Sequence, residues 1–339
     1  MHKKINTLLQ NKNQKVLSSG ENVIRFGILG CGYIGQKHAK FISENPDCEL
    51  VALCDVTENN WTKSLNIPFF SDKNIFLQQE NIDVVCICTP NAFHAKQAIE
   101  AIKAGKHVVI EKPMGLTKVE CENVIFTALN HQKQVFVVMQ NRYATTAQWL
   151  KNLVENDILG KIFLVEINAY WNRDERYYKG DWHGKKDLDG GTLFTQFSHF
   201  IDTIYWIFGD VKNITSRFFN FNHQNQIEFE DSGIINFDLE KGGVGAFNYS
   251  TSVWDKNMES TLTVIAENGS LKISGQYMNE VSFCHIKNYQ MPELPTTQND
   301  NHRHIIQNVV DSLQGKSNIA TNALEGMKVV EIIEKIYSH

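Results

Sequence analysis

The stretch VIRFGILGCGYIGQKHAKFISENPDCELVALCD, residues 23–55, decides the first part of the fold. Its apolar start, Val23 to Leu29, predicts a buried strand, and the glycines at 30, 32 and 35 predict a tight turn that opens a helix. A second apolar run ends on Asp55, about twenty residues beyond the turn. Strand, glycine turn, helix and acidic residue in this order are typical of a dinucleotide-binding βαβ unit.

Each part of this unit has a physical role toward a dinucleotide. Glycines at 30 and 32 let the backbone approach a pyrophosphate, which the helix N-terminus stabilises, and Gly35 lets helix and strand pack closely. The predicted contacts in this turn are Gly30, Cys31, Gly32, Tyr33, Ile34 and Gly35. Asp55 would accept hydrogen bonds from ribose hydroxyls and repel a 2'-phosphate, so the sequence favours NAD over NADP.

Beyond this unit the pattern continues and then changes. Short apolar runs at 84–88, 107–110 and 135–138 alternate with helical segments at 92–104 and 117–131, which predicts parallel strands with helical crossovers. After residue 145, long strand-like segments dominate, and Asn268-Gly269 is a strong hairpin signal. The sequence predicts an α/β Rossmann domain followed by an α+β domain with a large open, mostly antiparallel sheet.

The predicted domain limits are 23–144 for the Rossmann domain and 145–339 for a substrate-binding and oligomerisation domain. Residues 1–22 are expected to form an N-terminal extension. Two helical segments near the C-terminus are compatible with packing back on the first domain.

Composition excludes several classes of function. The chain has 339 residues, 42% of them hydrophobic and 21% charged, and a net charge of -5. Such a balance is ordinary for a soluble globular protein, and without a dense Lys/Arg block no nucleic-acid partner is expected. No apolar run approaches the length of a membrane span, and the seven cysteines form no C-x-x-C pair. We expect a cytoplasmic protein with reduced thiols and no membrane partner.

Metal binding is not expected either. The twelve histidines form no H-x-x-x-H or H-E-x-x-H pattern. His302 and His304 are two residues apart on a predicted helix, so their rings should point in different directions.

Two loops at the carboxyl ends of predicted strands are the strongest candidates for chemistry. Thr89-Pro90-Asn91 follows one strand and Glu111-Lys112-Pro113 follows the next. Open parallel sheets bind their ligands at this edge, so both loops should face one crevice. Lys112 could donate to a substrate oxygen or take its proton, although a single lysine in a loop can also be merely solvated.

These motifs resemble those of the glucose-fructose oxidoreductase, inositol dehydrogenase and rhizopine-catabolism family (Gfo/Idh/MocA), from about Val23 to the end. The resemblance rests on the following segments and residues: 30–35, Asp55, 89–91 with His94, 111–113, 141–143, 190–191, His199 and Asp202. It implies a sheet whose face covers the nicotinamide, dimers or tetramers formed through that sheet, and a cis peptide before Pro113. With the turn and Asp55, the expected cofactor-binding residues are Thr89, Pro90, Asn91, His94, Glu111, Lys112 and Gln140.

A predicted helix from Thr192 to Phe208 carries the remaining catalytic candidate. Thr195 and His199 are spaced i and i+4, so they should share one face of this apolar helix. The family usually has an acid where this chain has Thr195, and that acid works with the histidine. Because the acid is missing here, either His199 or Lys112 remains the candidate base.

The segment from Tyr170 to Trp182 is rich in Tyr, Trp and Arg. Such residues stack on sugar rings and grip carboxylate or phosphate, but they also form oligomer interfaces, and the sequence favours neither role. The predicted substrate-binding residues are Lys112, Arg142, Tyr143, Arg173, Tyr178, Trp182, Thr195, Gln196 and His199.

The predicted function is NAD-dependent oxidation of a ring hydroxyl of a sugar or nucleotide sugar, or reduction of the ketone. Resemblance extends to dehydrogenases that oxidise C3 of UDP-linked N-acetylhexosaminuronic acids. Two alternatives remain open: an NAD-dependent glycosidase acting through transient C3 oxidation, and a non-enzymatic NAD- or sugar-binding regulator.

Overall fold

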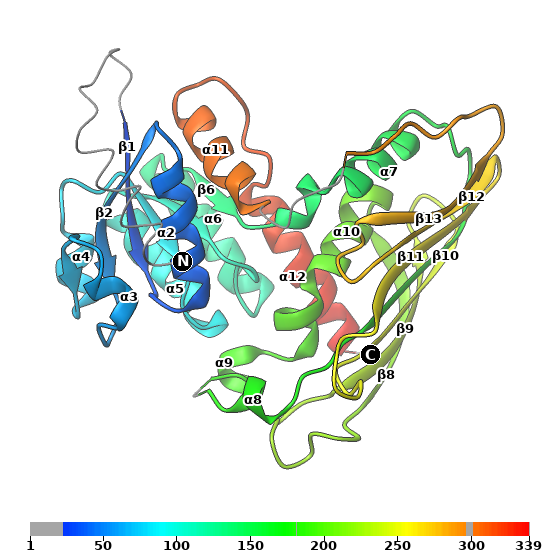
Figure 1. Cartoon of the computed structure of the whole chain (residues 1–339), viewed down its shortest axis with the longest axis horizontal. Helices are drawn as coiled ribbons and strands as arrows, with labels where there is room; N and C mark the ends of the chain where they lie inside the picture. The colour runs from blue at the N-terminus through cyan, green and yellow to red at the C-terminus, as the bar shows by residue number, and fades with distance from the viewer. Residues whose placement is uncertain (1–22, 181, 296–300, 339) are drawn as a thin grey trace. The chain divides into compact units, whose positions relative to one another are not determined.

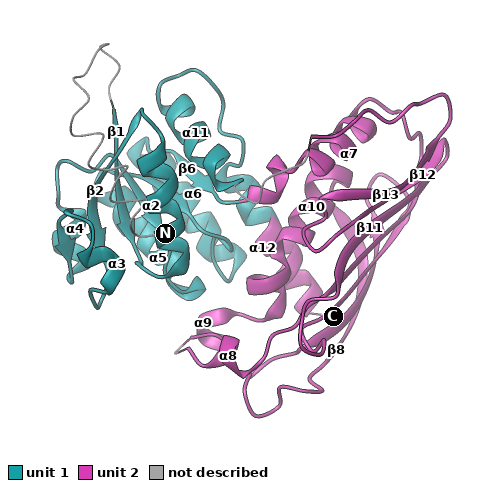
Figure 2. Ribbon diagram, in the orientation of Figure 1, with its two compact units in different colours: residues 1–138, 301–328 teal, residues 139–300, 329–339 magenta. Residues whose placement is uncertain are grey.

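We describe the protein from a computed structural model, over residues 23–180, 182–295 and 301–338. The predicted extension, residues 1–22, lies outside the described residues. The chain divides into two compact units (Figure 2). Within the described residues, the first unit holds 23–138 and 301–328, and the second holds 139–180, 182–295 and 329–338.

The first unit contains a six-stranded parallel sheet in the order β3-β2-β1-β4-β5-β6 (Figure 1). Its strands are β1 (Ile24–Leu29), β2 (Cys48–Cys54), β3 (Phe69–Phe70), β4 (Val84–Ile87), β5 (His107–Ile110) and β6 (Val135–Val137). The chain runs outward from β1 to β3 and then outward from β4 to β6 on the other side. Strand order therefore reverses between β1 and β4, where open parallel sheets bind ligands beyond the carboxyl ends of their strands.

Helices connect these strands. They are α2 (Tyr33–Glu44), α3 (Asn60–Lys63), α4 (Lys73–Leu77), the 3-10 turn η1 (Asn91–Phe93), α5 (His94–Lys103) and α6 (Lys118–His131). From much later in the chain, α11 (His302–Leu313) joins the same unit and packs on α2. An ion pair of 2.8 Å between Arg303 and Glu44 joins these two helices. Helix α12 (Ala323–Tyr337) begins in the first unit and ends in the second.

The second unit contains a seven-stranded sheet in the order β13-β12-β11-β7-β10-β9-β8. Its strands are β7 (Ile162–Tyr170), β8 (Val211–Phe219), β9 (Ser232–Leu239), β10 (Val244–Ser250), β11 (Glu259–Ala266), β12 (Gly269–Ser274) and β13 (Glu280–Ile286). All neighbours are antiparallel except β7 and β10, which run parallel. The predicted fold, a Rossmann domain followed by a mostly antiparallel sheet, is confirmed.

One face of this sheet is buried against helices. The helical segments are η2 (Gln140–Tyr143), α7 (Thr145–Glu155), α8 (Glu175–Tyr178), α9 (Lys186–Asp189), the π-helical turn η3 (Leu193–Phe197) and α10 (Ser198–Phe208). Phe197 and Phe200 contact Phe247 and Tyr249 of β10, with ring centroids 5.0–6.1 Å apart. This aromatic packing fixes the helix that carries His199 on the sheet.

Three elements differ from their predicted form. The predicted helix 192–208 begins with a π-helical turn, a feature that is frequent at functional sites. Of the long strand-like segments predicted after residue 145, the one over 227–239 becomes a strand only from Ser232, because the chain before it forms a loop around the Asp231 carboxylate. The edge strand β13 was not predicted, since its side chains are mostly exposed and its apolar pattern is weak.

None of the helices in the described part of the chain is long and apolar enough to cross a membrane.

Candidate active site

The glycine turn between β1 and α2 has the backbone geometry that its sequence predicts. Gly30 has a φ of 97°, and a Cβ there would lie 2.6 Å from the backbone carbonyl of Cys88, so only glycine fits. A Cβ at Gly35 would collide with the carbonyl oxygen of Gly30. A Cβ at Gly32 would meet nothing within 4 Å, and no side chain caps the N-terminus of α2 there. This helix end thus offers backbone N–H groups beside open space, as a diphosphate requires.

Asp55 lies at the carboxyl end of β2 and braces this turn. Its carboxylate accepts hydrogen bonds from the backbone N–H groups of Cys31, at 2.6 Å, and Val56, at 2.7 Å. The side chain of Cys31 is buried, so any contact from this residue to a ligand would use its backbone. Tyr33 and Val56 expose large side chains next to the turn. Val56 was not among the predicted residues, although an apolar side chain directly after the acidic residue is a usable signal.

The loops after β4 and β5 are tied together by His94. Its Nδ1 lies 2.6 Å from the carbonyl oxygen of Pro113, and its Nε2 lies 2.7 Å from that of Thr89. Burial lowers the pKa of His94, against the opposing effect of these two hydrogen bonds. The ring is thus buried, and both of its nitrogens lie against carbonyl oxygens of the two loops. Asn91 is also buried, at the start of η1.

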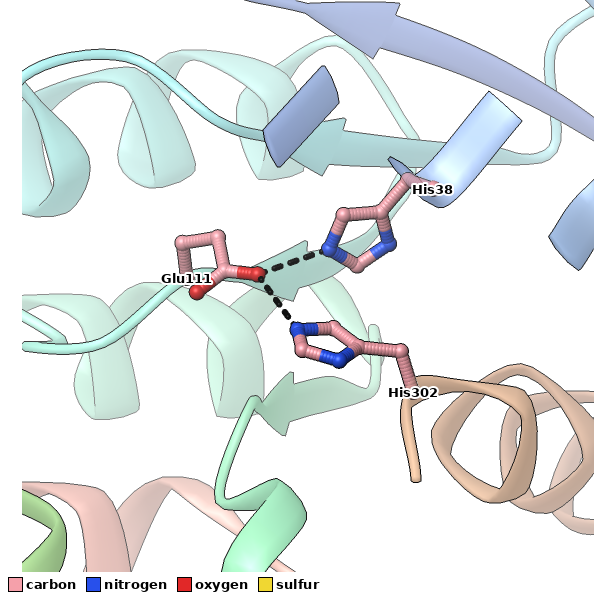
Figure 3. Close-up of side chains that lie close together, drawn as sticks. All are labelled: His38, Glu111 and His302. Atoms are coloured by element: carbon pink, nitrogen blue, oxygen red, sulfur yellow. Dashed lines mark hydrogen bonds and ion pairs between the residues drawn. The ribbon is translucent and has the colours of Figure 1, made fainter. Parts of the chain in front are cut away.

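Lys112 is the second residue after β5, and it lies between the buried Glu111 and a cis peptide. Glu111 turns its side chain into the unit toward His38 and His302 (Figure 3). The Lys112-Pro113 peptide is cis, as the sequence predicts. Lys112 itself is half-buried.

His199 lies at the start of α10, immediately after the π-helical turn, and it is nearly buried. The amide Nε2 of Gln140 lies 2.9 Å from His199 Nε2. An amide nitrogen can only donate, so in this arrangement the Nε2 lone pair of His199 accepts that hydrogen bond. Gln140 belongs to η2, which also carries Tyr143, whose pKa burial raises to about 12.

The hydroxyl of Thr195 contacts a carboxylate from the preceding short helix. The Thr195 hydroxyl donates a hydrogen bond to the carboxylate of Asp189, whose other oxygen accepts the backbone N–H of Gly184 at 2.8 Å. Asp189 is the last residue of α9, and it is followed by Gly190 and Gly191 with φ of 90° and 135°. These two glycines reverse the chain, so the buried acid faces Thr195.

Arg173 is the centre of a polar cluster on the aromatic segment. Its Nε donates to Gln196 Oε1 at 2.8 Å, and Gln196 in turn donates to the Tyr177 hydroxyl. The guanidinium lies over the rings of Trp171 and Tyr177, at 4.9 and 5.1 Å from their centroids. Arg173 is half-buried, and this burial lowers the pKa of its guanidinium.

The other predicted substrate residues lie in different settings. Arg142 is buried in an ion pair with Asp202, so its guanidinium is engaged within the unit. Tyr178 is half-buried, and burial raises its pKa to about 12. Trp182 stacks on His183 with ring centroids 3.8 Å apart. The arrangement brings Arg173, Gln196 and Tyr177 together, with Thr195 adjacent in sequence to Gln196.

Two family models match successive parts of this chain. Residues 24–139 match the oxidoreductase family with an NAD-binding Rossmann fold, and residues 147–272 match the GFO/IDH/MocA C-terminal domain. The solved structure of the WlbA dehydrogenase from Bordetella pertussis, in complex with NADH and UDP-GlcNAcA, is 30% identical with a TM-score of 0.84. The match covers 93% of this chain and 95% of that one. The chain belongs to the GFO/IDH/MocA oxidoreductase family.

Other members of the GFO/IDH/MocA family are similar over comparable lengths. The WlbA dehydrogenase from Chromobacterium violaceum, also solved with NADH and UDP-GlcNAcA, is 27% identical with a TM-score of 0.85 and a coverage of 96% of both chains. D-glucoside 3-dehydrogenase of Escherichia coli K12 is 25% identical, over 93% of this chain and 94% of that protein. The predicted NAD cofactor and oxidoreductase class are confirmed, and the uncapped α2 N-terminus, the open space at Gly32 and Asp55 fit NAD.

Proposed function

We propose that this GFO/IDH/MocA oxidoreductase uses NAD to oxidise the C3 hydroxyl of a UDP-linked 2-acetamido hexuronic acid, or to reduce the corresponding ketone. The similarity to the two WlbA dehydrogenases supports this substrate class, because it extends over both units. The cofactor would lie at residues 30–35 and Asp55, and the substrate at the polar cluster of the second unit.

The charge state of Arg173 is the observation that carries the substrate class. The hydrogen-bond partners of its guanidinium are neutral: Gln196 Oε1, the carbonyl oxygen of Asn172 and Asn257 Oδ1. Among the described residues, no carboxylate lies within ion-pair distance of it. A half-buried cation without a counter-ion favours an anionic ligand, and the planar guanidinium suits a carboxylate or a phosphate. A uronic acid on a diphosphate carries both groups.

The catalytic step needs a base for the hydroxyl proton. Bound NAD supplies the hydride acceptor. We assign the base role to Lys112, because the Nε2 lone pair of His199 is engaged by Gln140. Lys112 would take the O–H proton on its amine, and NAD held by residues 30–35 and Asp55 would supply the acceptor for the hydride of the same carbon, so that the hydroxyl becomes a ketone. His199 and Thr195 would orient the substrate by hydrogen bonds.

A substrate panel tests this function. Purified protein is mixed with NAD and UDP-GlcNAcA, UDP-GlcNAc, free glucuronic acid or myo-inositol, and formation of NADH is followed by absorbance. Enzyme at a concentration close to that of NAD makes a single turnover visible if the cofactor stays bound. We expect turnover of UDP-GlcNAcA and much less of UDP-GlcNAc, which lacks the carboxylate. Turnover of free polyols alone contradicts the proposal, and release of a chromophore from a glycoside without net NADH identifies a glycosidase.

The Asp189 carboxylate should orient Thr195 for substrate binding. Because the Thr195 hydroxyl donates its proton to Asp189, a hydrogen bond between Thr195 and a substrate hydroxyl would have the Thr195 oxygen as the acceptor. In Asp189→Asn the amide can donate to Thr195, and this orientation is lost. We expect KM to rise about tenfold, since hydrogen bonds that involve a charged group contribute about 1.5–3 kcal/mol. Initial rates over a range of UDP-GlcNAcA concentrations measure this.

Asp187→Asn is the matched control, because Asp187 is an exposed residue of the same short helix. It should leave KM and kcat unchanged. Thermal melting of both variants separates a local effect on binding from general destabilisation. An unaltered KM in folded Asp189→Asn would show that the carboxylate does not act on the substrate through Thr195.

We also propose that the outer face of the seven-stranded sheet forms a homo-oligomer interface. An apolar row crosses three adjacent strands on this face: Ile265 pairs with Leu164, which pairs with Val244. Ile265 and Val244 are 43% and 50% exposed. Lysine at the centre of an apolar interface is strongly unfavourable. We therefore expect Ile265→Lys to lower the molar mass measured by size-exclusion chromatography with light scattering.

Val119→Lys is the control for this experiment, because Val119 is an exposed apolar residue on α6, far in sequence from the sheet. The molar mass that light scattering measures for Val119→Lys should equal that of the unaltered protein. An oligomer that survives Ile265→Lys would place its interface on another surface.

A further inference from the structure

Three buried side chains from distant parts of the sequence converge in the first unit (Figure 3), and one of them, Glu111, precedes Lys112 in the chain. They are His38 on α2, Glu111 directly after β5, and His302 at the start of α11. Glu111 Oε1 lies 2.8 Å from His38 Nε2 and 3.6 Å from His302 Nε2. The two rings meet edge to face at 5.7 Å, and Phe41 stacks on His302. The Glu111 carboxylate is thus buried, and these two histidine rings are the groups that stabilise its negative charge.

His38 is hydrogen-bonded to this carboxylate at 2.8 Å, and the Nε2 atom of His302 faces the same oxygen at 3.6 Å. The Nδ1 atoms of His38 and His302 are buried, and neither has a hydrogen-bond partner in the described part of the chain. A proton on either Nδ1 would therefore be a buried donor without an acceptor, which is unfavourable. Each ring then carries its proton on Nε2 and points it at Glu111. Burial acts to raise the pKa of Glu111, and the interactions with His302 and His38 act to lower it.

The same three atoms are close enough to hold a metal ion, but the surroundings of the rings disfavour one. A metal bound at both Nε2 atoms would require the protons on Nδ1. Histidines that bind metals almost always donate that other N–H to a carboxylate, a carbonyl or water. Here both protons would face apolar surroundings, so hydrogen bonding to Glu111 explains the trio better.

The Glu111 carboxylate also contacts the backbone of Lys112. Its second oxygen, Oε2, accepts a hydrogen bond from the backbone N–H of Lys112 at 3.3 Å. On the other side, the carbonyl oxygen of Pro113 is held by His94 at 2.6 Å. The backbone that carries the Lys112 side chain is therefore fixed from both directions.

We propose that His38 and His302 are positioning residues for Lys112: they fix the Glu111 carboxylate, which fixes the Lys112 backbone at the edge of the sheet. Helix α11, which follows the second unit's sheet in the sequence, thereby completes the catalytic edge of the first unit. This inference rests on the proposed function of Lys112 as the base.

Two substitutions at one position test the inference. His302→Phe keeps a ring against Phe41 but removes the N–H, whereas His302→Gln keeps an amide N–H with similar reach. Misplacement of a reacting group by about 1 Å can cost about 100-fold in rate. We expect His302→Phe to lower kcat for UDP-GlcNAcA by about tenfold to a hundredfold with little change in KM, and His302→Gln to restore most of it. His304→Phe, on the exposed side of the same helix, should change neither value.

A spectroscopic measurement makes the test independent of any substrate. Lysines are labelled by reductive methylation with carbon-13, and the Lys112 signal is assigned as the one missing in Lys112→Arg. We expect this signal to shift in His302→Phe, to return in His302→Gln, and to stay in place in His304→Phe. If the unaltered protein turns over no UDP-GlcNAcA, the proposed substrate fails while this measurement still decides on the positioning role.

Three results would overturn the inference. The first is an unmoved Lys112 signal in folded His302→Phe, and the second is equal loss of kcat in His302→Phe and His302→Gln. The third is one equivalent of bound zinc in the purified protein, measured by mass spectrometry of the metal content. If His302→Phe does not fold, His302→Ala, which leaves room for water, replaces it in every comparison.

Discussion

A Lys112→Met variant is expected to keep NADH binding through the glycine turn and Asp55, and to turn over its substrate about 10² to 10⁴ times more slowly than the unaltered protein. Methionine keeps an unbranched stem of similar length but has no amine to take the hydroxyl proton. The features that fit the cofactor, Gly30 to Gly35 and Asp55, are untouched by this change. NADH binding is measured by its fluorescence, and kcat by absorbance with UDP-GlcNAcA.

Lys112→Arg distinguishes a base from a mere cation at this position. Arginine keeps the positive charge but is not deprotonated in proteins, so a base cannot be replaced by it. We expect kcat of Lys112→Arg to stay as low as that of Lys112→Met. Full activity of the arginine variant would mean that the charge alone matters and that His199 takes the proton. Lys118→Met, at the start of α6, is the control for loss of a lysine.

The sequence was sufficient to predict the parts of the fold that local constraints determine. Gly30 needs a positive φ where no side chain fits, and Asp55 follows a buried strand at a fixed distance. Thr117 was the predicted start of a helix, and it forms a capping box with Glu120. Each of these features depends on neighbours within a few residues or on one βαβ unit. The pattern of residue types along the sequence is therefore enough to predict it.

Contacts between distant segments could not be predicted in this way. The residues next to His302 in the sequence do not indicate that its ring faces Glu111. This contact depends on the packing of α11 on α2, which brings together two segments far apart in the sequence. The Asp189–Thr195 contact is close in sequence but depends on the reversal at Gly190 and Gly191, so a search along helical spacings from Thr195 misses it. An acid directly before two glycines at a helix start was the available signal.

Arg142, one of the predicted substrate-binding residues, has a partner that the sequence does not reveal. Its guanidinium lies against Asp202, with Nη2 2.6 Å from Oδ1 and Nε 3.0 Å from Oδ2. Both side chains are buried, at 4% and 0% exposure. The pair joins η2 to α10, the same two elements that Gln140 and His199 join. We therefore expect Arg142 to act through the fold rather than by touching the substrate.

An Arg142→Met variant should lose about 3–5 kcal/mol of stability, because it leaves the Asp202 carboxylate buried without its guanidinium partner. For a unit of this size, about 2–4 °C of melting temperature corresponds to each kcal/mol, so the melting temperature should fall by roughly 10 °C. Differential scanning calorimetry measures this change. Catalysis should fall as well at temperatures where the variant is folded, since Gln140 is no longer held against His199.

The double variant Arg142→Met/Asp202→Leu distinguishes two effects of Arg142→Met: the loss of the ion-pair partner of Asp202, and the loss of the packing contacts of Arg142. Replacement of a buried ion pair by apolar residues of similar volume is often neutral or stabilising, so the double variant should melt well above Arg142→Met. The double-mutant cycle, completed with Asp202→Leu alone, then gives a large coupling energy between the two residues. Additive losses in the two single variants would mean that the pair contributes by packing alone, for instance through the contact of Arg142 with the Trp206 ring at 5.4 Å. If instead Arg142→Met melts like the unaltered protein but binds UDP-GlcNAcA weakly, the guanidinium must leave Asp202 to contact the substrate.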